Sequence, residues 1–153
     1  MDGIVGTHLL AQVGFIVKDV EASKKKWAAF LGVDVPETQP VGDYSVTQTQ
    51  YRGEPAPEAS CEMAFFDVGP NLQLELIQPN EKPSTWRDYL EEHGEGMHHV
   101  AFQVKDSGAC VAKAEKAGLK LIQHGVYGDG SGEYNYLDAP DLKCIVELLE
   151  SYK

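Results

Sequence analysis

The sequence predicts an α+β fold made of two copies of one β-α-β-type unit, because the same strand-and-helix pattern occurs twice along the chain. Residues 12–19 read QVGFIVKD and residues 99–106 read HVAFQVKD, with five of the eight positions identical. In both segments apolar side chains fall at every second position, which is typical of a strand that buries one face. A repeat period this long indicates two supersecondary units within one domain, and not a solenoid.

A helix is predicted directly after each repeated strand. Asp19 and Asp106 follow the two strands and are suited to cap the N-terminus of a helix. Gly32 and Gly118 end the two helical stretches, at a position where glycine is favoured. The first helix is expected to pack on the sheet through one stripe of apolar residues: Val20, Trp27, Phe30 and Leu31. Helices would then cover one face of the sheet and leave the other face free to curve.

The later part of each copy also repeats. Residues 65–79 and 136–150 each contain an apolar strand, an aspartate in a turn, and a second strand that includes Glu-Leu. We therefore expect a single domain over residues 1–153, which consists of a first module, a linker with a short helix and a second module: 8–79, 80–96 and 97–150.

Composition and charge argue against two large classes of partner. The 153 residues include 24 acidic and 13 basic side chains, a formal net charge of −11, and show no basic face that could meet phosphates. No apolar run is long enough to cross a bilayer, and the N-terminus has no signal-peptide pattern. The three cysteines share no CxxC spacing, which fits buried thiols in a reducing compartment. We therefore expect a cytoplasmic protein with no nucleic-acid or membrane partner.

Four polar residues share the face of the sheet that the helices leave free. Strand alternation places Gln12 opposite Val13, and the same parity places His99 on that face in the second copy. Glu75 and Glu147 lie opposite leucines on the later strands, where an ionised carboxylate is costly unless it is paired or bound to a cation. One histidine, two carboxylates and one amide oxygen suit zinc, nickel, cobalt, manganese or magnesium. The repeat favours such a metal site over four unrelated structural residues.

These segments resemble the vicinal oxygen chelate superfamily, which includes glyoxalases, bleomycin-resistance proteins and dioxygenases. The resemblance rests on QVGFIVKDVEASKKKWAAFLG, LQLELIQP, GMHHVAFQVKD and CIVELLE, and it extends from about Leu10 to Leu149. It implies an α+β fold in which two βαβββ modules form a curved sheet around a central metal site. The implied metal ligands are the four polar residues described above: Gln12, Glu75, His99 and Glu147. A homodimer is the implied assembly.

Two subfamilies share features with this chain. The ligand set is similar to that of zinc-type glyoxalase I, but Ile16 and Pro79 stand where that enzyme has the arginine and asparagine that serve glutathione. The strand GMHHVAF and the stretch PEASCEMAFF are more similar to methylmalonyl-CoA epimerase, in which the proposed base would correspond to Glu58. This chain departs from the epimerase pattern at Gln12, where a histidine is usual.

The resemblance implies a metal-dependent isomerase or epimerase that abstracts a proton α to a carbonyl or thioester. The candidate bases are Glu147, Glu58 and Glu75. The implied substrate is a small carbonyl compound or an acyl-CoA, although the sequence shows no phosphate-binding motif for a CoA. Two alternatives remain open: a glyoxalase I-like lactoylglutathione lyase, and a metal-free ligand-binding protein of the bleomycin-resistance type. An extradiol dioxygenase is disfavoured, because Gln12 stands where its two-histidine, one-carboxylate iron site needs a histidine.

Overall fold

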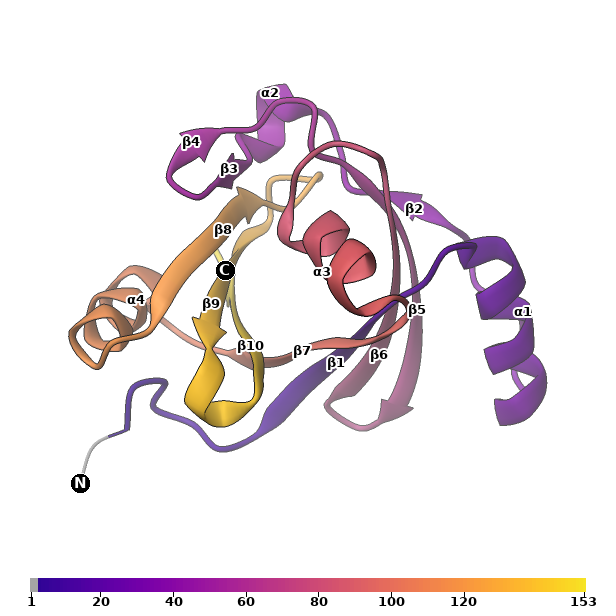
Figure 1. Ribbon diagram of the computed structural model, residues 1–153. Helices are drawn as coiled ribbons and strands as arrows, with labels where there is room; N and C mark the ends of the chain where they lie inside the picture. Colours follow the sequence, from indigo (N-terminus) through magenta and orange to yellow (C-terminus); the bar gives the residue numbers. More distant parts are fainter. Residues whose placement is uncertain (1–2) are drawn as a thin grey trace.

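The computed structural model describes residues 3–153, which form one mixed sheet accompanied by helices (Figure 1). The ten strands of these residues are ordered β2-β5-β6-β1-β7-β10-β9-β8-β3-β4. The strands are β1 (Leu10–Ile16), β2 (Gln39–Pro40), β3 (Gln50–Tyr51), β4 (Glu54–Pro55), β5 (Cys61–Gly69), β6 (Leu72–Pro79), β7 (Gly96–Gln103), β8 (Lys120–Val126), β9 (Gly132–Ala139) and β10 (Cys144–Ser151). The helices are α1 (Val20–Leu31), α2 (Tyr44–Thr47), α3 (Thr85–His93), α4 (Ser107–Lys116) and a 3₁₀ turn, η1 (Pro140–Leu142). Within the described part of the chain, no helix combines the length and the apolar character that spanning a membrane requires.

The two repeated segments lie side by side at the centre of the sheet. β1 pairs with β7 in antiparallel orientation, so the two halves of the chain meet there. β6 runs parallel to β1 on one side of this pair, and β10 runs parallel to β7 on the other side. The sheet curves strongly, with these four strands in the middle of its concave face (Figure 1). The predicted α+β class and curved sheet are confirmed.

The two long helices begin where the sequence predicts. Asp19 accepts a hydrogen bond from the backbone N–H of Ala22 and caps α1, while Gly32, with a φ of 72°, follows its last residue. Asp106 caps α4 in the same way through the N–H of Ala109. In each case the N-cap is an aspartate in the loop that connects the strand to the helix.

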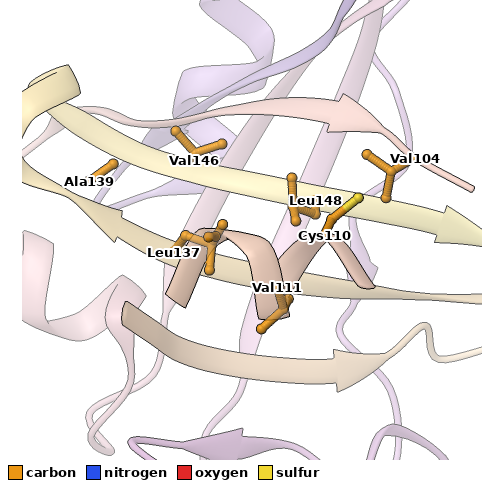
Figure 2. Close-up of a cluster of buried hydrophobic side chains, with 8 residues drawn as sticks. Val104, Cys110, Val111, Leu137, Ala139, Val146 and Leu148 are labelled. Atoms are coloured by element: carbon orange, nitrogen blue, oxygen red, sulfur yellow. The ribbon is translucent and has the colours of Figure 1, made fainter. Parts of the chain in front are cut away.

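Helices α1 and α4 cover the convex face of the sheet. α4 packs on β8, β9 and β10, and Figure 2 shows Cys110 of this helix beside Leu148 of β10. The cluster beneath α4 consists of eight buried residues: Val104, Cys110, Val111, Ala114, Leu137, Ala139, Val146 and Leu148. The cluster beneath α1 is its counterpart in the first half: Val17, Val20, Ala28, Ala64, Phe66, Leu74 and Leu76. Burial of each large apolar side chain contributes roughly 1.5–3 kcal/mol, so these clusters fix both helices to the sheet.

The stripe predicted for α1 is only partly right. Val20 is buried, but Phe30 is 81% exposed and Leu31 is 36% exposed. A helix turns by about 100° per residue, so Phe30, ten positions after Val20, points well away from the buried face. The buried stripe instead includes Lys24, which is 7% exposed and has its ammonium 3.1 Å from the carboxylate of Glu21.

The linker helix α3 lies against the concave face, inside the curve of the sheet (Figure 1). Trp86 is 2% exposed and packs on the rings of Tyr134 and Tyr136, and its Nε1 donates to the hydroxyl of Tyr136 at 3.0 Å. The backbone N–H of Thr85 donates to the side-chain oxygen of Gln123 on β8 at 2.8 Å. These contacts fix α3 beside the middle of the sheet and make it one wall of the interior.

Candidate metal centre

Four adjacent strands each place one polar side chain in the middle of the concave face. Glu75 lies on β6, Gln12 on β1, His99 on β7 and Glu147 on β10, and all four side chains are buried, with exposed fractions between 0 and 6%. The strand register explains why they converge, because Gly14 on β1 pairs with Glu75 on one side and with His99 on the other. Since Gly14 has no side chain, the ring of His99 can lie directly over it.

The distances within this cluster match the edges of a metal coordination sphere. Nε2 of His99 lies 2.9 Å from Oε1 of Gln12, 3.1 Å from Oε1 of Glu147 and 3.4 Å from Oε1 of Glu75. Ligand bonds of about 2.1 Å that meet at 90–110° place neighbouring ligand atoms roughly 3.0–3.4 Å apart. One small divalent ion could therefore contact all four groups.

One of the two orientations of the Gln12 amide fits a cation. Its Nε2 donates to the side-chain oxygen of Gln73 at 2.8 Å, which turns Oε1 towards the cluster. This oxygen then lies 2.9 Å from Oε1 of Glu147 and 3.2 Å from Oε1 of Glu75. Three oxygens without hydrogens repel one another unless a positive charge lies between them. Without an ion, the reversed amide satisfies these groups: its nitrogen donates to both carboxylates, and its oxygen accepts from the Gln73 amide, which is reversed with it.

Without a metal, the imidazole of His99 is the positive charge of the cluster. Burial alone would lower the pKa of His99, but the charges and hydrogen bonds of Glu147 and Glu75 outweigh burial and raise this pKa to about 10. Burial raises the pKa of Glu75, and its hydrogen bond with His99 opposes that change. Below pH 10 the metal-free protein therefore holds a proton on the nitrogen that would bind the ion.

We expect metal binding near neutral pH to release about one proton from His99, because only the deprotonated nitrogen is a ligand. The apparent metal affinity should therefore rise about tenfold per pH unit as the pH increases towards 10. Calorimetric titration in two buffers with different ionisation enthalpies measures the number of protons released. A binding enthalpy that does not depend on the buffer would contradict the prediction.

Strand alternation predicts that His98, whose parity is opposite to that of His99, faces the helix layer, and this prediction is wrong. The pairing of β1 with β7 shifts register at this point, and such a bulge changes the face to which a side chain points. The ring of His98 is 1% exposed and lies edge-on to the rings of Tyr136 and Tyr89, with centroid distances of 5.2 and 5.7 Å. Its Nδ1 lies 2.9 Å from Nδ1 of His99.

This contact gives His98 a role towards the metal site. A hydrogen bond between the two Nδ1 atoms needs one proton between them. Nε2 of His99 faces the cluster, so His99 carries its other proton on Nδ1 and donates it to His98. Burial lowers the pKa of His98 well below its usual value, so its neutral ring can accept this bond. His98 therefore fixes the orientation and tautomer of His99.

We expect His98→Asn to keep metal affinity close to that of the unchanged protein, and His98→Gln to weaken it by about 10–100-fold. The asparagine oxygen falls near the position of Nδ1 and can accept from His99, whereas the glutamine oxygen falls near Nε2. Competition with a chromophoric chelator measures both affinities, and far-UV circular dichroism checks that both variants are folded. Equal affinities in the two variants would show that the Nδ1 contact does not position the ligand.

The structure does not bring Glu58, the third candidate base, to this cluster. Its side chain is 74% exposed and lies 3.8 Å from the ammonium of Lys82. The backbone oxygen of Glu58 accepts from the side chain of Asn80, which holds this segment at the far end of β6, after Pro79. The expectation that Glu58 acts as a base therefore has no support in the geometry.

A cavity of about 790 Å³ lies over the cluster and is lined by Gln12, Glu75 and Glu147. Its apolar walls include aromatic residues that no sequence pattern assigns to a site: Phe65, Trp86, Tyr134 and Tyr136. Burial and the charge of Glu147 raise the pKa of Tyr127 at the rim, so its hydroxyl stays protonated. Tyrosines at strand positions are usually core residues, so only the curvature of the sheet shows that these rings line a cavity.

Sequence comparison identifies relatives over most of the chain. Residues 11–136 match the family described as the Glyoxalase/Bleomycin resistance protein/Dioxygenase superfamily. An ethylmalonyl-CoA/methylmalonyl-CoA epimerase from Cereibacter sphaeroides is 27% identical over 143 residues, which cover 91% of this chain and 95% of that protein. The mitochondrial methylmalonyl-CoA epimerase of Homo sapiens is 25% identical over 118 residues, which cover 76% of this chain and 58% of that protein.

Solved structures give the same fold. The match to methylmalonyl-CoA epimerase from Mycobacterium tuberculosis has a TM-score of 0.66 and 19% sequence identity. It covers 100% of this chain and 93% of that chain. The match to a Streptomyces coelicolor methylmalonyl-CoA epimerase in complex with 2-nitronate-propionyl-CoA has a TM-score of 0.65 and 21% sequence identity. It covers 94% of this chain and 97% of that chain. At this identity the structures establish the fold, while the family match covers most of the sequence. The chain belongs to the glyoxalase/bleomycin resistance protein/dioxygenase superfamily.

Proposed function

We propose that this chain is a metal-dependent epimerase or isomerase that removes a proton α to a carbonyl or thioester. The observation that supports the proposal is the pair of buried carboxylates, Glu75 and Glu147, on the two outer strands of the central four. The strands of Gln12 and His99 lie between them, so the two carboxylates flank one centre from opposite sides. Two carboxylates suit an epimerase, in which a proton leaves one face of the α-carbon and another arrives at the opposite face.

A divalent ion held by Gln12, Glu75, His99 and Glu147 would supply positive charge where the enolate oxygen develops negative charge. Zinc, nickel, cobalt, manganese and magnesium all suit this donor set. In the proposed reaction the carboxylate of Glu147 accepts the α-proton, and the carboxylate of Glu75 exchanges a proton with the opposite face of the α-carbon.

The walls of the cavity would assist this proton transfer. Trp86 and Tyr136, at 2% exposure each, hold one side of the cavity closed through the hydrogen bond between them. A site with few waters strengthens the charge interactions inside it and reduces loss of the proton to solvent. His98 and Gln73 would keep the rings and amides of the site in fixed orientations, through their hydrogen bonds to His99 and Gln12.

The proposal agrees with the names of the relatives, which are epimerases of ethylmalonyl-CoA or methylmalonyl-CoA. An acyl-CoA is therefore a proposed substrate for this chain, beside small carbonyl compounds. Lactoylglutathione lyase activity is the second candidate, because the structure brings together the same four positions that the resemblance to glyoxalase I names.

Exchange of the α-proton in deuterated water tests the proposal directly. Protein loaded with each of the five metals is incubated with methylmalonyl-CoA, with hydroxyacetone, and with the hemithioacetal of methylglyoxal and glutathione. We expect deuterium to enter the α-position of at least one compound, and a chelator to stop the exchange. Failure of every metal and compound, in protein shown to contain about one ion per chain, would overturn the proposal.

A further inference from the structure

A second cavity is separated from the metal centre by helix α3. It has a volume of about 510 Å³, which is in the usual range for a small-molecule site, and it shares no lining residue with the cavity over the cluster. Two consecutive residues of α3 show the separation, because Trp86 lines the cavity over the cluster and Thr85 lines the second cavity. The ring of His98 forms part of the wall of the second cavity and contacts His99 through Nδ1. A ligand in this cavity would therefore bind without touching the ion.

Two buried polar atoms in residues of this wall have no hydrogen-bond partner. They are Nε2 of His98 and Oγ1 of Thr85, the only such side-chain atoms among the residues that the structure describes. The two side chains belong to residues that are 1% and 3% exposed. Burial lowers the pKa of His98 and the nearby backbone of Thr85 opposes this, but that backbone forms no hydrogen bond of normal geometry with Nε2. Native proteins rarely leave buried polar groups unpaired, so two of them at one cavity indicate a wall built to bind a polar group.

Both atoms are donors. Nδ1 of His98 accepts the hydrogen bond from His99, so the neutral imidazole carries its proton on Nε2. The hydroxyl of Thr85 also has a proton to donate. One carbonyl oxygen has two lone pairs and can accept from both groups. The buried end of the cavity therefore suits an acceptor oxygen.

An acceptor for an N–H group lies one helical turn away. Asp88 also lines the cavity and follows Thr85 by three residues, so the two side chains share one face of α3. The hydroxyl of Tyr51 donates to Oδ2 of Asp88, and the guanidinium of Arg52 lies 3.5 Å from the same oxygen. These contacts leave Oδ1 of Asp88 available to accept. An amide carries a carbonyl oxygen and N–H groups side by side, and so matches both needs.

The charges at this cavity argue against a carboxylate as the ligand. The permanently charged residues of the lining are three acids and two bases: Asp88, Glu92, Asp138, Arg52 and Lys143. Both bases are exposed, and Arg52 already pairs with Asp88. An anion at the buried end would lose its water without gaining a buried partner charge, a cost that an uncharged amide avoids.

We propose that this cavity is a second ligand site, which binds a small uncharged amide with an apolar body. The carbonyl oxygen of the ligand accepts from Nε2 of His98 and Oγ1 of Thr85, and its N–H donates to Asp88. Ile122 and Ile145 supply apolar wall for the rest of the ligand. The inference is independent of the proposed reaction, because none of these residues is a metal ligand or a candidate base.

Nuclear magnetic resonance titration of the isotopically labelled protein tests the site, with benzamide as the probe. We expect benzamide to bind with a dissociation constant of about 1 mM or below. It should shift the backbone amide signals of Thr85, Asp88 and Ile145, but not those of Tyr127 and Ser131 in the cavity over the cluster. The titration is run with zinc-loaded protein and repeated after chelation, so that its outcome does not depend on the metal. No binding up to the solubility limit of benzamide, or shifts centred on Tyr127 and Ser131, would overturn the inference.

Benzoate has the shape of benzamide and one negative charge, so it tests the choice of an uncharged ligand. We expect benzoate to bind at least about tenfold more weakly than benzamide. Benzoate that binds as tightly as benzamide, or more tightly, would overturn the proposed ligand class.

Thr85→Val removes the unpartnered hydroxyl and keeps the shape of the side chain. We expect this variant to bind benzamide at least about tenfold more weakly, with an unfolding temperature of the ligand-free protein that is unchanged or higher. Thr47→Val is the matched control, because Thr47 is 2% exposed, lies outside the lining and has its hydroxyl 3.0 Å from that of Thr49. The control should keep its benzamide affinity and lose stability. Unchanged benzamide affinity in Thr85→Val, or a loss of stability equal to that of Thr47→Val, would contradict the role of the hydroxyl.

His98→Asn separates the two nitrogens of the imidazole. Asparagine keeps an oxygen near the position of Nδ1 for His99, but it has no donor at the position of Nε2. We therefore expect this variant to retain metal and to bind benzamide at least about tenfold more weakly. Benzamide affinity equal to that of the unchanged protein would show that Nε2 does not hold the ligand.

Discussion

Replacing Gly14 with alanine is expected to lower metal affinity at least about 100-fold, although Gly14 is not a ligand. An alanine Cβ at this position would lie 2.1 Å from Cε1 of His99, 2.5 Å from its Nδ1 and 2.6 Å from its Nε2. These separations are far below van der Waals contact, so the ring has to move by more than 1 Å. Metal–ligand distances tolerate deviations of only about 0.2 Å, so a displaced ring can no longer bind the ion.

His99 has little room to move away from an added methyl group. Its side chain is fully buried, the ring of Tyr136 lies 5.2 Å from it, and His98 holds its Nδ1. The strain of overpacking typically costs 1–3 kcal/mol of stability, so we expect Gly14→Ala to fold with a reduced unfolding temperature. Elemental analysis and chelator competition measure the metal, and circular dichroism reports the fold.

Two further variants control this experiment. Gly108→Ala places a Cβ 3.6 Å from its nearest neighbour, an oxygen of Asp106, so it should keep about one ion per chain. Its position in α4 should leave stability unchanged, or raise it by about 0.5–1 kcal/mol. His99→Ala removes the ring without a clash and should also lose the metal. Unchanged metal affinity in Gly14→Ala or in His99→Ala would mean that His99 is not a ligand.

Strand alternation and the internal repeat together group the residues of the centre. A side-chain period of two within each strand, with the repeat that aligns residues 12–19 and 99–106, predicts Gln12 and His99 on one face. The structure brings these two residues together with Glu75 and Glu147, at the distances described above. Their role as metal ligands stays a prediction, because the grouping itself does not identify what they bind.

Other features depend on contacts that no local pattern specifies. The bulge near His98 gives β7 one residue more than β1, and no local sequence pattern marks this position. The position of α3 depends on the packing of Trp86 against Tyr136, which is fifty residues further along the chain. Glu58 is in the stretch that resembles an epimerase, yet the segment after β4 points its carboxylate towards Lys82.

Glu147→Gln is expected to reduce the rate of α-proton exchange by about 10²–10⁴-fold, which is the usual contribution of a positioned general base. The glutamine side chain keeps an oxygen that can still face the ion, so the metal content should stay near one per chain. Deuterium incorporation, followed by nuclear magnetic resonance on the substrate that exchanges fastest with the unchanged protein, measures this rate. Elemental analysis of the same samples separates loss of the base from loss of the metal.

The two carboxylates should also be distinguishable by the stereochemistry of the substrate. If Glu147 and Glu75 serve opposite faces, Glu147→Gln slows exchange mainly for one enantiomer and Glu75→Gln mainly for the other. Glu62→Gln is the matched control, because Glu62 is an exposed residue of β5 that does not line the cavity. Full exchange of both enantiomers by metal-loaded Glu147→Gln would remove Glu147 as the base. Equal slowing of both enantiomers in each variant would instead indicate one shared proton path, because two independent bases cannot produce that pattern.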